Sequence, residues 1–227
     1  MPDPRPVIVL GAGGHARVVA DALLARRVPV LGYADPARDK GSPGPLDLPV
    51  LGGDEAVLSR PAQEVRLAIG VGSTGDAGPR RRLYERFVAA GYGIVAVLHP
   101  EAVVARGVVV GRGAQVMAGA VVQPGTTIGA NVIVNTAASV DHDCRLGAHA
   151  HIAPGAVLCG DVTVGDGAHV GAGAVVRPGV AIGAGALVGM GIIVLADVPP
   201  EARLSPRTTL VWPDEPAVLA AVRSTDR

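Results

Sequence analysis

The sequence predicts two architectures in one chain, an α/β domain followed by an all-β parallel β-helix. Three observations support this prediction. Strand-like and helix-like segments alternate over residues 7–98, a strict six-residue repeat runs from residue 104 to residue 194, and the composition favours glycine and small aliphatic residues. The 227-residue chain has 32 glycines and 49% hydrophobic residues but only 2% aromatic residues. Such a composition fits a tightly wound core without room for large rings.

In the first segment, apolar runs predict strands and segments with helical spacing predict helices. The expected strands cover residues 7–11, 28–35, 65–72 and 92–99, and the expected helices cover residues 15–27 and 78–91. Alternation of this kind predicts a parallel sheet with helical crossovers. We therefore assign residues 1–99 to a small Rossmann-like domain.

The second segment repeats every six residues. Every sixth position from Val104 to Val194 holds valine, isoleucine or leucine, which makes sixteen consecutive matches. A strict hexad repeat is the signature of a parallel β-helix, in which three hexads form one coil of 18 residues and the aliphatic residue points inward. We assign residues 100–197 to this β-helix and residues 198–227 to a tail that can hold a short helix.

Charge and cysteine content exclude several classes of protein. The 20 basic and 20 acidic side chains balance, which argues against nucleic acid as a partner. Two cysteines are too few for a disulfide scaffold and fit a reducing cytosol. No segment is typical of a signal peptide or a transmembrane helix, so we expect a cytoplasmic protein without membrane insertion. The histidines lack a recognised metal-ligand spacing, and we expect no metal.

The stretch NTAASVDHDC, residues 135–144, is the polar exception within the repeat. His142 falls at a corner position where the neighbouring coils carry proline or glycine, so its side chain should project outward. Asp143 can hold one imidazole tautomer and increase the basicity of the ring. With Asn135 nearby, the pattern predicts a general base, and a solvated surface histidine is the alternative. His151 falls on another side of the prism, so only a second subunit could bring it to His142.

The stretch GAGGHA, residues 11–16, follows a strand and opens a helix. Backbone N–H groups at a helix N-terminus bind phosphate well. The stretch also matches a dinucleotide fingerprint, with Asp35 near the end of the second expected strand, so an NAD-dependent enzyme is an alternative. Against that alternative, the domain lacks a second mononucleotide-binding half, and an NAD site leaves His15 unexplained.

Together, GAGGHA, the sixteen hexads with NTAASVDHDC, and HIAPGAVLCGD at residues 151–161 resemble the bacterial hexapeptide-repeat sugar acetyltransferases. The chain is most similar to the branch that acetylates nucleotide-linked 4-amino-4,6-dideoxysugars, as in bacillosamine and perosamine pathways. The resemblance covers residues 5–197. It implies a left-handed β-helix, direct acetyl transfer from acetyl-CoA to a nucleotide sugar, and a homotrimer with active sites between subunits. Sugar O-acetylation of the sialic acid type and a scaffold with a decayed site remain alternatives.

The resemblance also implies roles for individual residues. It makes His142 the proton acceptor and Asp143 the neighbour that increases its basicity. The expected substrate-binding residues are Gly13, Gly14, His15, Asp35, Gly70 and Asn135, and the expected acetyl-CoA-binding residues are His151, Gly160, Ala172 and Met190. Pro36 stands where some relatives carry a second acidic residue, and the tail departs from the family's usual ending.

Overall fold

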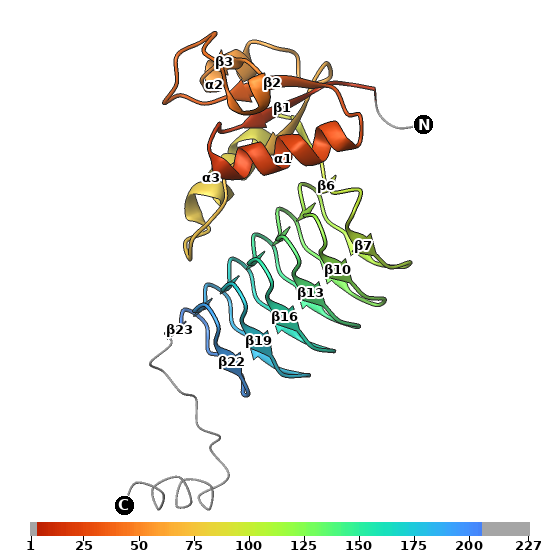
Figure 1. Ribbon diagram of the computed structural model, residues 1–227. Helices are drawn as coiled ribbons and strands as arrows, with labels where there is room; N and C mark the ends of the chain where they lie inside the picture. The colour runs from red at the N-terminus through yellow and green to blue at the C-terminus, as the bar shows by residue number, and fades with distance from the viewer. Residues whose placement is uncertain (1–3, 206–227) are drawn as a thin grey trace, which may run out of the picture.

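The computed structural model describes residues 4–205, in which an α/β domain caps one end of a long stack of coils (Figure 1). The domain holds a five-stranded parallel sheet in the order β3-β2-β1-β4-β5. Its strands are β1 (Val7–Leu10), β2 (Val30–Ala34), β3 (Val50–Gly52), β4 (Arg66–Ile69) and β5 (Gly93–Ile94). Its helices are α1 (Gly14–Ala25), α2 (Asp54–Leu58) and α3 (Gly78–Ala89), with a 3-10 turn, η1, at Pro45–Asp47.

The predicted α/β alternation is confirmed, and the structure adds elements to it. Strand β3 and helix α2 have 3 and 5 residues, which is too short to produce a visible period. The strand expected over residues 92–99 is divided in two. Its first part is β5, and its second part is β6 (Val97–Leu98), which pairs with β9 and so already belongs to the β-helix.

The helices cover both faces of the sheet. Helix α1 buries Ala16, Val19 and Leu23 against one face, while α2 and α3 cover the other face, where Phe87 is fully buried. Helix α1 also lies between the sheet and the β6 end of the coil stack (Figure 1). Met117 of the β-helix packs into the same cluster as α1, so the two parts of the chain share a hydrophobic core.

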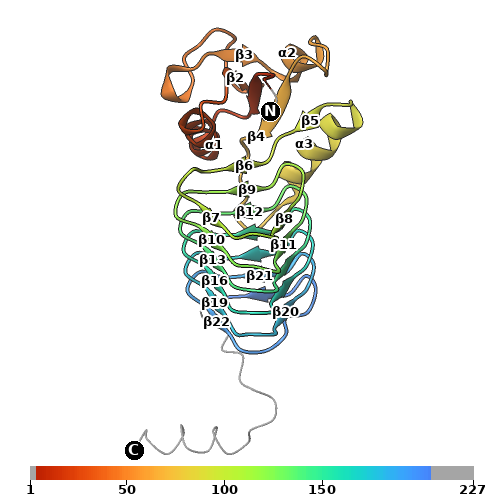
Figure 2. The same cartoon turned by 90° about the vertical axis from the view of Figure 1, so that its right-hand side faces the viewer.

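The β-helix has three flat sides, each formed by a parallel sheet, and Figure 2 shows the second and third sides along the two edges of the stack. The first side contains β6, β9 (Gln115–Val116), β12 (Ile133–Val134), β15 (His151–Ile152), β18 (His169–Val170), β21 (Leu187–Val188) and β23 (Arg203–Leu204). The second side contains β7 (Val103–Val104), β10 (Val121–Val122), β13 (Ser139–Val140), β16 (Val157–Leu158), β19 (Val175–Val176) and β22 (Ile193–Val194). The third side contains β8 (Val109–Val110), β11 (Thr127–Ile128), β14 (Arg145–Leu146), β17 (Thr163–Val164) and β20 (Ala181–Ile182).

The predicted register of the repeat is confirmed. Each aliphatic hexad position is the second residue of a two-residue strand, and these side chains fill the interior of the prism. Residues 18 apart are paired between successive coils, as His151 is with His169. The first residue of each strand points outward, which decides what each side of the prism presents to its surroundings.

Candidate active site

The predicted catalytic pair lies on the corner that joins the second side to the third side. His142 Nδ1 and Asp143 Oδ2 are 2.8 Å apart, and 61% and 63% of the two side chains are exposed. The carboxylate can accept a hydrogen bond from Nδ1–H, which leaves the lone pair of Nε2 free to take a proton. The backbone N–H of His142 donates to Asp141 Oδ1 at 2.8 Å, which steadies the corner.

Backbone conformation places the Asp143 carboxylate. The φ angle of Asp143 is 60°, in the left-handed region that aspartate tolerates better than most residues. Gly125 occupies the same corner of the preceding coil with a φ angle of 78°. A side chain on Gly125 would collide with Asp143 Oδ1, so glycine leaves room for the carboxylate.

The imidazole opens into a pocket of about 550 Å³, which we call the His142 pocket. Its lining is Asp141, His142, Cys159, Gly160, Asp161, Pro178 and Gly179. The hydrogen bond that His142 donates to Asp143 raises the pKa of His142 above its ordinary value, and the carboxylates of Asp141 and Asp161 add to this increase. The ring is therefore a stronger base than a free imidazole.

Cys144 is not placed as a nucleophile. Cys144 is buried inside the prism, its Sγ donates to the carbonyl oxygen of Cys159, and burial raises the pKa of its thiol to about 11. A thiol with so high a pKa is protonated at neutral pH and unreactive. Cys144 therefore contributes packing inside the prism.

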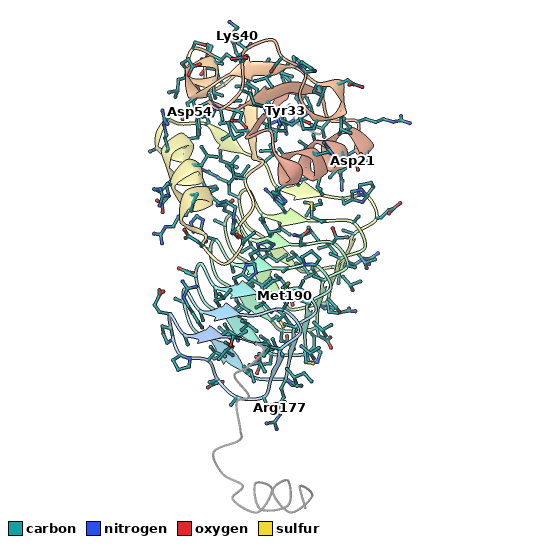
Figure 3. All side chains as sticks on the ribbon, turned by 60° about the vertical axis from the view of Figure 1, so that its left-hand side comes forward. Asp21, Tyr33, Lys40, Asp54, Arg177 and Met190 are labelled. Carbon is teal, nitrogen blue, oxygen red and sulfur yellow. The ribbon has the colours of Figure 1, made fainter. Side chains whose placement is uncertain are left out.

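A larger cavity of about 830 Å³, which we call the interdomain pocket, lies between the α/β domain and the β-helix. Its polar end contains His15, Ser73, Asn135, His151 and His169, and its other end is lined by small and apolar residues that include Ala172, Leu187, Met190 and Leu204. Met190, labelled on the β-helix in Figure 3, is 71% exposed. The pocket therefore offers hydrogen-bonding groups at one end and an apolar wall at the other.

His151 is held in one tautomer. Its Nδ1 is 3.0 Å from the carbonyl oxygen of Ser73, which can only accept, so Nδ1 carries the proton. Its Nε2 lies 3.1 Å from Asn135 Nδ2. Since Asn135 Oδ1 accepts the backbone N–H of Thr136, Nδ2 is the donor to His151. Burial lowers the pKa of His151 to about 3, so the ring stays neutral.

His15 connects the glycine turn to the first side of the β-helix. Its Nε2 is 2.7 Å from Gln115 Oε1, and Gln115 Nε2 donates to the carbonyl oxygen of Ile69 at 2.6 Å. Burial lowers the pKa of His15, so this ring is also neutral at physiological pH. His15 also lines the interdomain pocket, so its ring can contact a ligand bound there.

The glycine turn lies at the point where the strand order of the sheet reverses. The neighbours of β1 are β2 on one side and β4 on the other, so loops diverge beyond the carboxyl ends of β1 and β4. Ligands of open α/β sheets bind at such a point. Gly13 and Gly14 are exposed there at the N-terminus of α1, with nothing within 4 Å of where a side chain would begin.

Two other predicted substrate-binding residues have structural contacts. Asp35 accepts the backbone N–H of Ala12 at 2.8 Å and that of Ala37 at 2.9 Å, so its carboxylate braces the glycine turn. Gly70 is buried, and a Cβ on it would lie 2.7 Å from the Cβ of Ala16. Gly70 therefore permits close packing of β4 against α1, and it lines neither pocket.

The structure thus divides the predicted site residues into three groups. His15, Asn135, His151, Ala172 and Met190 line the interdomain pocket; His142 and Gly160 line the His142 pocket, with Asp143 bonded to His142; and Gly13, Gly14, Asp35 and Gly70 lie around the glycine turn. The two pockets lie at opposite edges of the second side within one chain. Ser73, Gln115 and His169 were not among the predicted site residues, although the register places His169 directly after His151 in its column.

Within residues 4–205, no helix has the length and apolar character needed to cross a membrane. The same residues contain no cluster of three or more His, Cys, Asp or Glu side chains that could hold a metal ion.

Family models match both parts of the chain. Residues 6–87 match the PglD N-terminal domain, residues 143–178 match the bacterial transferase hexapeptide of six repeats, and residues 161–196 match the hexapeptide repeat of succinyl-transferase. A comparison with curated protein sequences found no match.

Solved structures match nearly the whole chain. The acetyltransferase domain of PglB from Neisseria gonorrhoeae, in complex with acetyl coenzyme A, is 37% identical over 86% of this chain and 93% of its own, with a TM-score of 0.80. PerB from Caulobacter crescentus, in complex with CoA and GDP-perosamine, is 40% identical over 87% of this chain and 92% of its own, also with a TM-score of 0.80. The chain belongs to the hexapeptide-repeat sugar acetyltransferases.

Membership of this family confirms the predicted fold class and excludes the NAD-dependent alternative as the best account of the glycine turn. WeeI from Acinetobacter baumannii shares the fold at 26% identity over 91% of this chain and 100% of its own, with a TM-score of 0.74. The similarity therefore covers the α/β domain as well as the repeats, including both pockets.

Proposed function

We propose that this chain transfers the acetyl group of acetyl-CoA to the C4 amine of a nucleotide-linked 4-amino-4,6-dideoxysugar. The observation that carries the proposal is the His142–Asp143 pair, exposed at a coil corner beside Gly160, in a chain 40% identical to an enzyme solved with CoA and GDP-perosamine. A panel of nucleotides bearing such sugars therefore forms the natural first set of acceptors.

The glycine turn and the interdomain pocket are proposed to bind the nucleotide sugar. The N–H groups around Gly13 and Gly14 at the start of α1 suit the phosphates, because the helix N-terminus favours negative charge. Asp35 holds this turn in place, and His15 reaches from it into the pocket. Asn135 at the far side of the pocket suits a sugar hydroxyl.

Acetyl-CoA is proposed to lie along the corner that joins the first side to the second side. Ala172 and Met190 give this corner a small and an apolar contact for an extended thioester arm. His151 is proposed to contact the acetyl end. Its Nε2 already accepts from Asn135, so its expected contribution is shape and a neutral polar edge rather than proton transfer.

The proposed chemistry is direct transfer. The amine attacks the acetyl carbonyl, a C–N bond forms, and the C–S bond breaks to release CoA as a thiolate, which becomes a thiol by accepting the proton that His142 has taken from the amine. His142 Nε2 takes the proton from the attacking nitrogen, and Asp143 stabilises the imidazolium that results. The Gly160 N–H has no acceptor among the described residues, and it suits the oxyanion of the tetrahedral intermediate.

The chain is further proposed to act as a homotrimer that joins the two pockets across subunits. The outward residues of the second side form an apolar stripe of Val103, Val121, Ser139, Val157, Val175 and Ile193. Val103 and Ile193 are 59% and 64% exposed. By contrast, the third side presents the polar residues Thr127, Arg145 and Thr163 between Val109 and Ala181 at its two ends. Burying the stripe against a second copy would bring one subunit's His142 corner towards the interdomain pocket of its neighbour.

We propose a cytoplasmic location for the reaction, which fits the two unpaired cysteines. The test of the function is release of CoA thiol from acetyl-CoA with UDP-, GDP- and dTDP-linked 4-amino-4,6-dideoxysugars, CMP-sialic acid and free sialic acid. Turnover with an amino sugar supports N-acetylation and identifies the carrier nucleotide. Turnover with sialic acid alone would replace the proposal with O-acetylation, and failure to bind acetyl-CoA would refute it.

A further inference from the structure

Arg80 is a buried cation at the junction of the two parts of the chain. It lies in the first turn of α3 and has no exposed surface. Its guanidinium donates through Nη1 to the carbonyl oxygen of Asn131 and through Nη2 to that of His149, at 2.6 Å for the second bond. No carboxylate within residues 4–205 forms an ion pair with it. Burial lowers the pKa of Arg80 to about 10.

The two carbonyl groups belong to the same corner of successive coils. Asn131 and His149 are 18 residues apart and both have left-handed φ angles, 55° and 62°. Adjacent coils are spaced like neighbouring strands, about 4.7–4.9 Å apart. A guanidinium presents several N–H groups in a planar fork and can bind both coils at once, whereas a lysine ammonium is a single point charge.

Helix α3 connects the buried Arg80 to the loop of residues 70–77. Arg80, Tyr84 and Phe87 form the buried stripe of the helix, and the Tyr84 ring stands edge-on to His149 with centroids 5.4 Å apart. The loop directly precedes α3 in the sequence, and in space it lies along the first side of the β-helix. A Cβ on Gly75 would lie 3.2 Å from Leu187, so the loop packs closely against the first side.

The loop in turn holds His151. Ser73 Oγ lies 2.9 Å from His151 Nδ1, and the Ser73 carbonyl oxygen lies 3.0 Å from the same nitrogen. These contacts join residues 78 positions apart in the sequence, so they depend on how the α/β domain is seated. Arg80 is the buried charged group that fixes this seating.

We propose that Arg80 is a positioning residue of the interdomain pocket, which seats the 70–77 loop on the β-helix so that Ser73 holds His151 in its neutral Nδ1–H tautomer. This inference rests on the proposed function, in which the pocket receives acetyl-CoA and the nucleotide sugar. It adds to that function a residue that touches neither reactant.

The positive charge of Arg80 also acts on four histidines near the junction of the two parts of the chain. Burial is the largest cause of the lowered pKa values of His15, His149, His151 and His169, and the positive charge of Arg80 lowers each of them further. Other groups also act on these rings. Arg81 lowers the pKa of His149, Glu85 and Asp166 raise it, and His15 and His169 lower the pKa of His151. Arg80 is the positive charge common to all four histidines.

The first test needs no substrate. NMR titration of the histidine rings should show that Arg80→Met raises the pKa values of His15, His149 and His169, because the positive charge that lowers each of them is removed. Arg80→Lys keeps the charge, so its histidine pKa values should remain closer to those of the unchanged protein. Arg81→Gln is the matched control on the same helix for His15, His151 and His169, since Arg81 is exposed, pairs with Glu85 and affects the pKa of His149 alone among the four histidines. Unchanged titration of His15, His149, His151 and His169 in Arg80→Met would overturn the electrostatic part of the proposal.

The second test separates binding from chemistry. Arg80→Lys loses the planar fork that binds the carbonyl groups of Asn131 and His149. It should therefore raise KM for acetyl-CoA and lower kcat/KM by up to about 100-fold. The rising limb of the kcat–pH profile should stay in place, because Arg80 does not contribute to the pKa of His142. Ser73→Ala should raise KM in the same way, and the Arg80→Lys, Ser73→Ala pair should be less than additive.

Full additivity of the pair, or an unchanged KM in folded Arg80→Lys, would overturn the positioning role. Arg80→Lys and Ser73→Ala decide the question if Arg80→Met does not fold. If the unchanged protein acetylates none of the sugars, the proposed function fails, and the titration still decides whether Arg80 controls the histidines.

Discussion

The imidazole of His142 lies against the α-carbon of Gly160, the residue one coil further along the same corner. A Cβ placed on Gly160 would be 2.6 Å from both Cε1 and Nε2 of His142. The ring can occupy its position only because the next coil has no side chain there. Glycine is thus required by the neighbouring imidazole rather than by backbone conformation, since Gly160 does not have a positive φ angle.

Gly160→Ala should therefore displace the His142 ring while the coil itself stays folded. We expect kcat to fall by as much as about 100-fold, because misplacing a reacting group by about 1 Å has effects of that size. Circular dichroism and the melting temperature should remain near those of the unchanged protein. Gly93→Ala, in β5, has open space where the methyl group would lie and no positive φ angle, so it controls for the added methyl group. Wild-type kcat in Gly160→Ala would show that the ring need not occupy this position.

The pH dependence of turnover should report the His142–Asp143 pair. The base acts when unprotonated, so kcat/KM should rise as pH increases through the pKa of His142. The hydrogen bond that the ring donates to the Asp143 carboxylate raises that pKa above its ordinary value of 6.5. Asp143→Asn removes the carboxylate, so the rising limb should move to lower pH and the plateau should fall. A limb that stays in place, or one that moves to higher pH, would contradict the proposed role of Asp143.

The apolar stripe should control the oligomeric state. Val157→Glu places a carboxylate in the middle of the second side, on an outward position whose loss leaves the interior of the prism intact. Analytical ultracentrifugation should show a trimer for the unchanged protein and smaller species for Val157→Glu, with loss of turnover because the two pockets are separated. Thr163→Glu, outward and exposed on the third side, should remain trimeric and active. A trimer that survives Val157→Glu would move the interface to another face.

Much of the fold could be predicted because coil geometry imposes a fixed period. An inward aliphatic residue every six positions is a requirement of the prism, so the register, the columns and the outward direction of His142 follow from the sequence. The short elements β3 and α2 could not be predicted, since they are held by pairing and packing rather than by their own periodicity.

The site could be predicted only in part for a related reason. His142 and Asp143 are neighbours in sequence and interrupt an apolar pattern, which makes them visible. Ser73 and Arg80 meet their partners 78 and 51 residues away, across the junction between the two parts. The family resemblance implied a substrate contact for Gly70, and the structure shows tight packing of Gly70 against α1. A contact between the Gly70 backbone and the sugar stays a prediction.

The most direct test of the central claim is the mass of the sugar product after incubation with acetyl-CoA and GDP- or UDP-linked 4-amino-4,6-dideoxysugar, with His142→Ala run in parallel. We expect a product heavier by one acetyl group, bound to nitrogen, with an equal amount of CoA thiol released. We also expect kcat to fall by about 10²- to 10⁴-fold in His142→Ala while the coil stays folded. Full turnover in that variant, or acetyl-CoA consumed without acetylation of the amine, would contradict that claim.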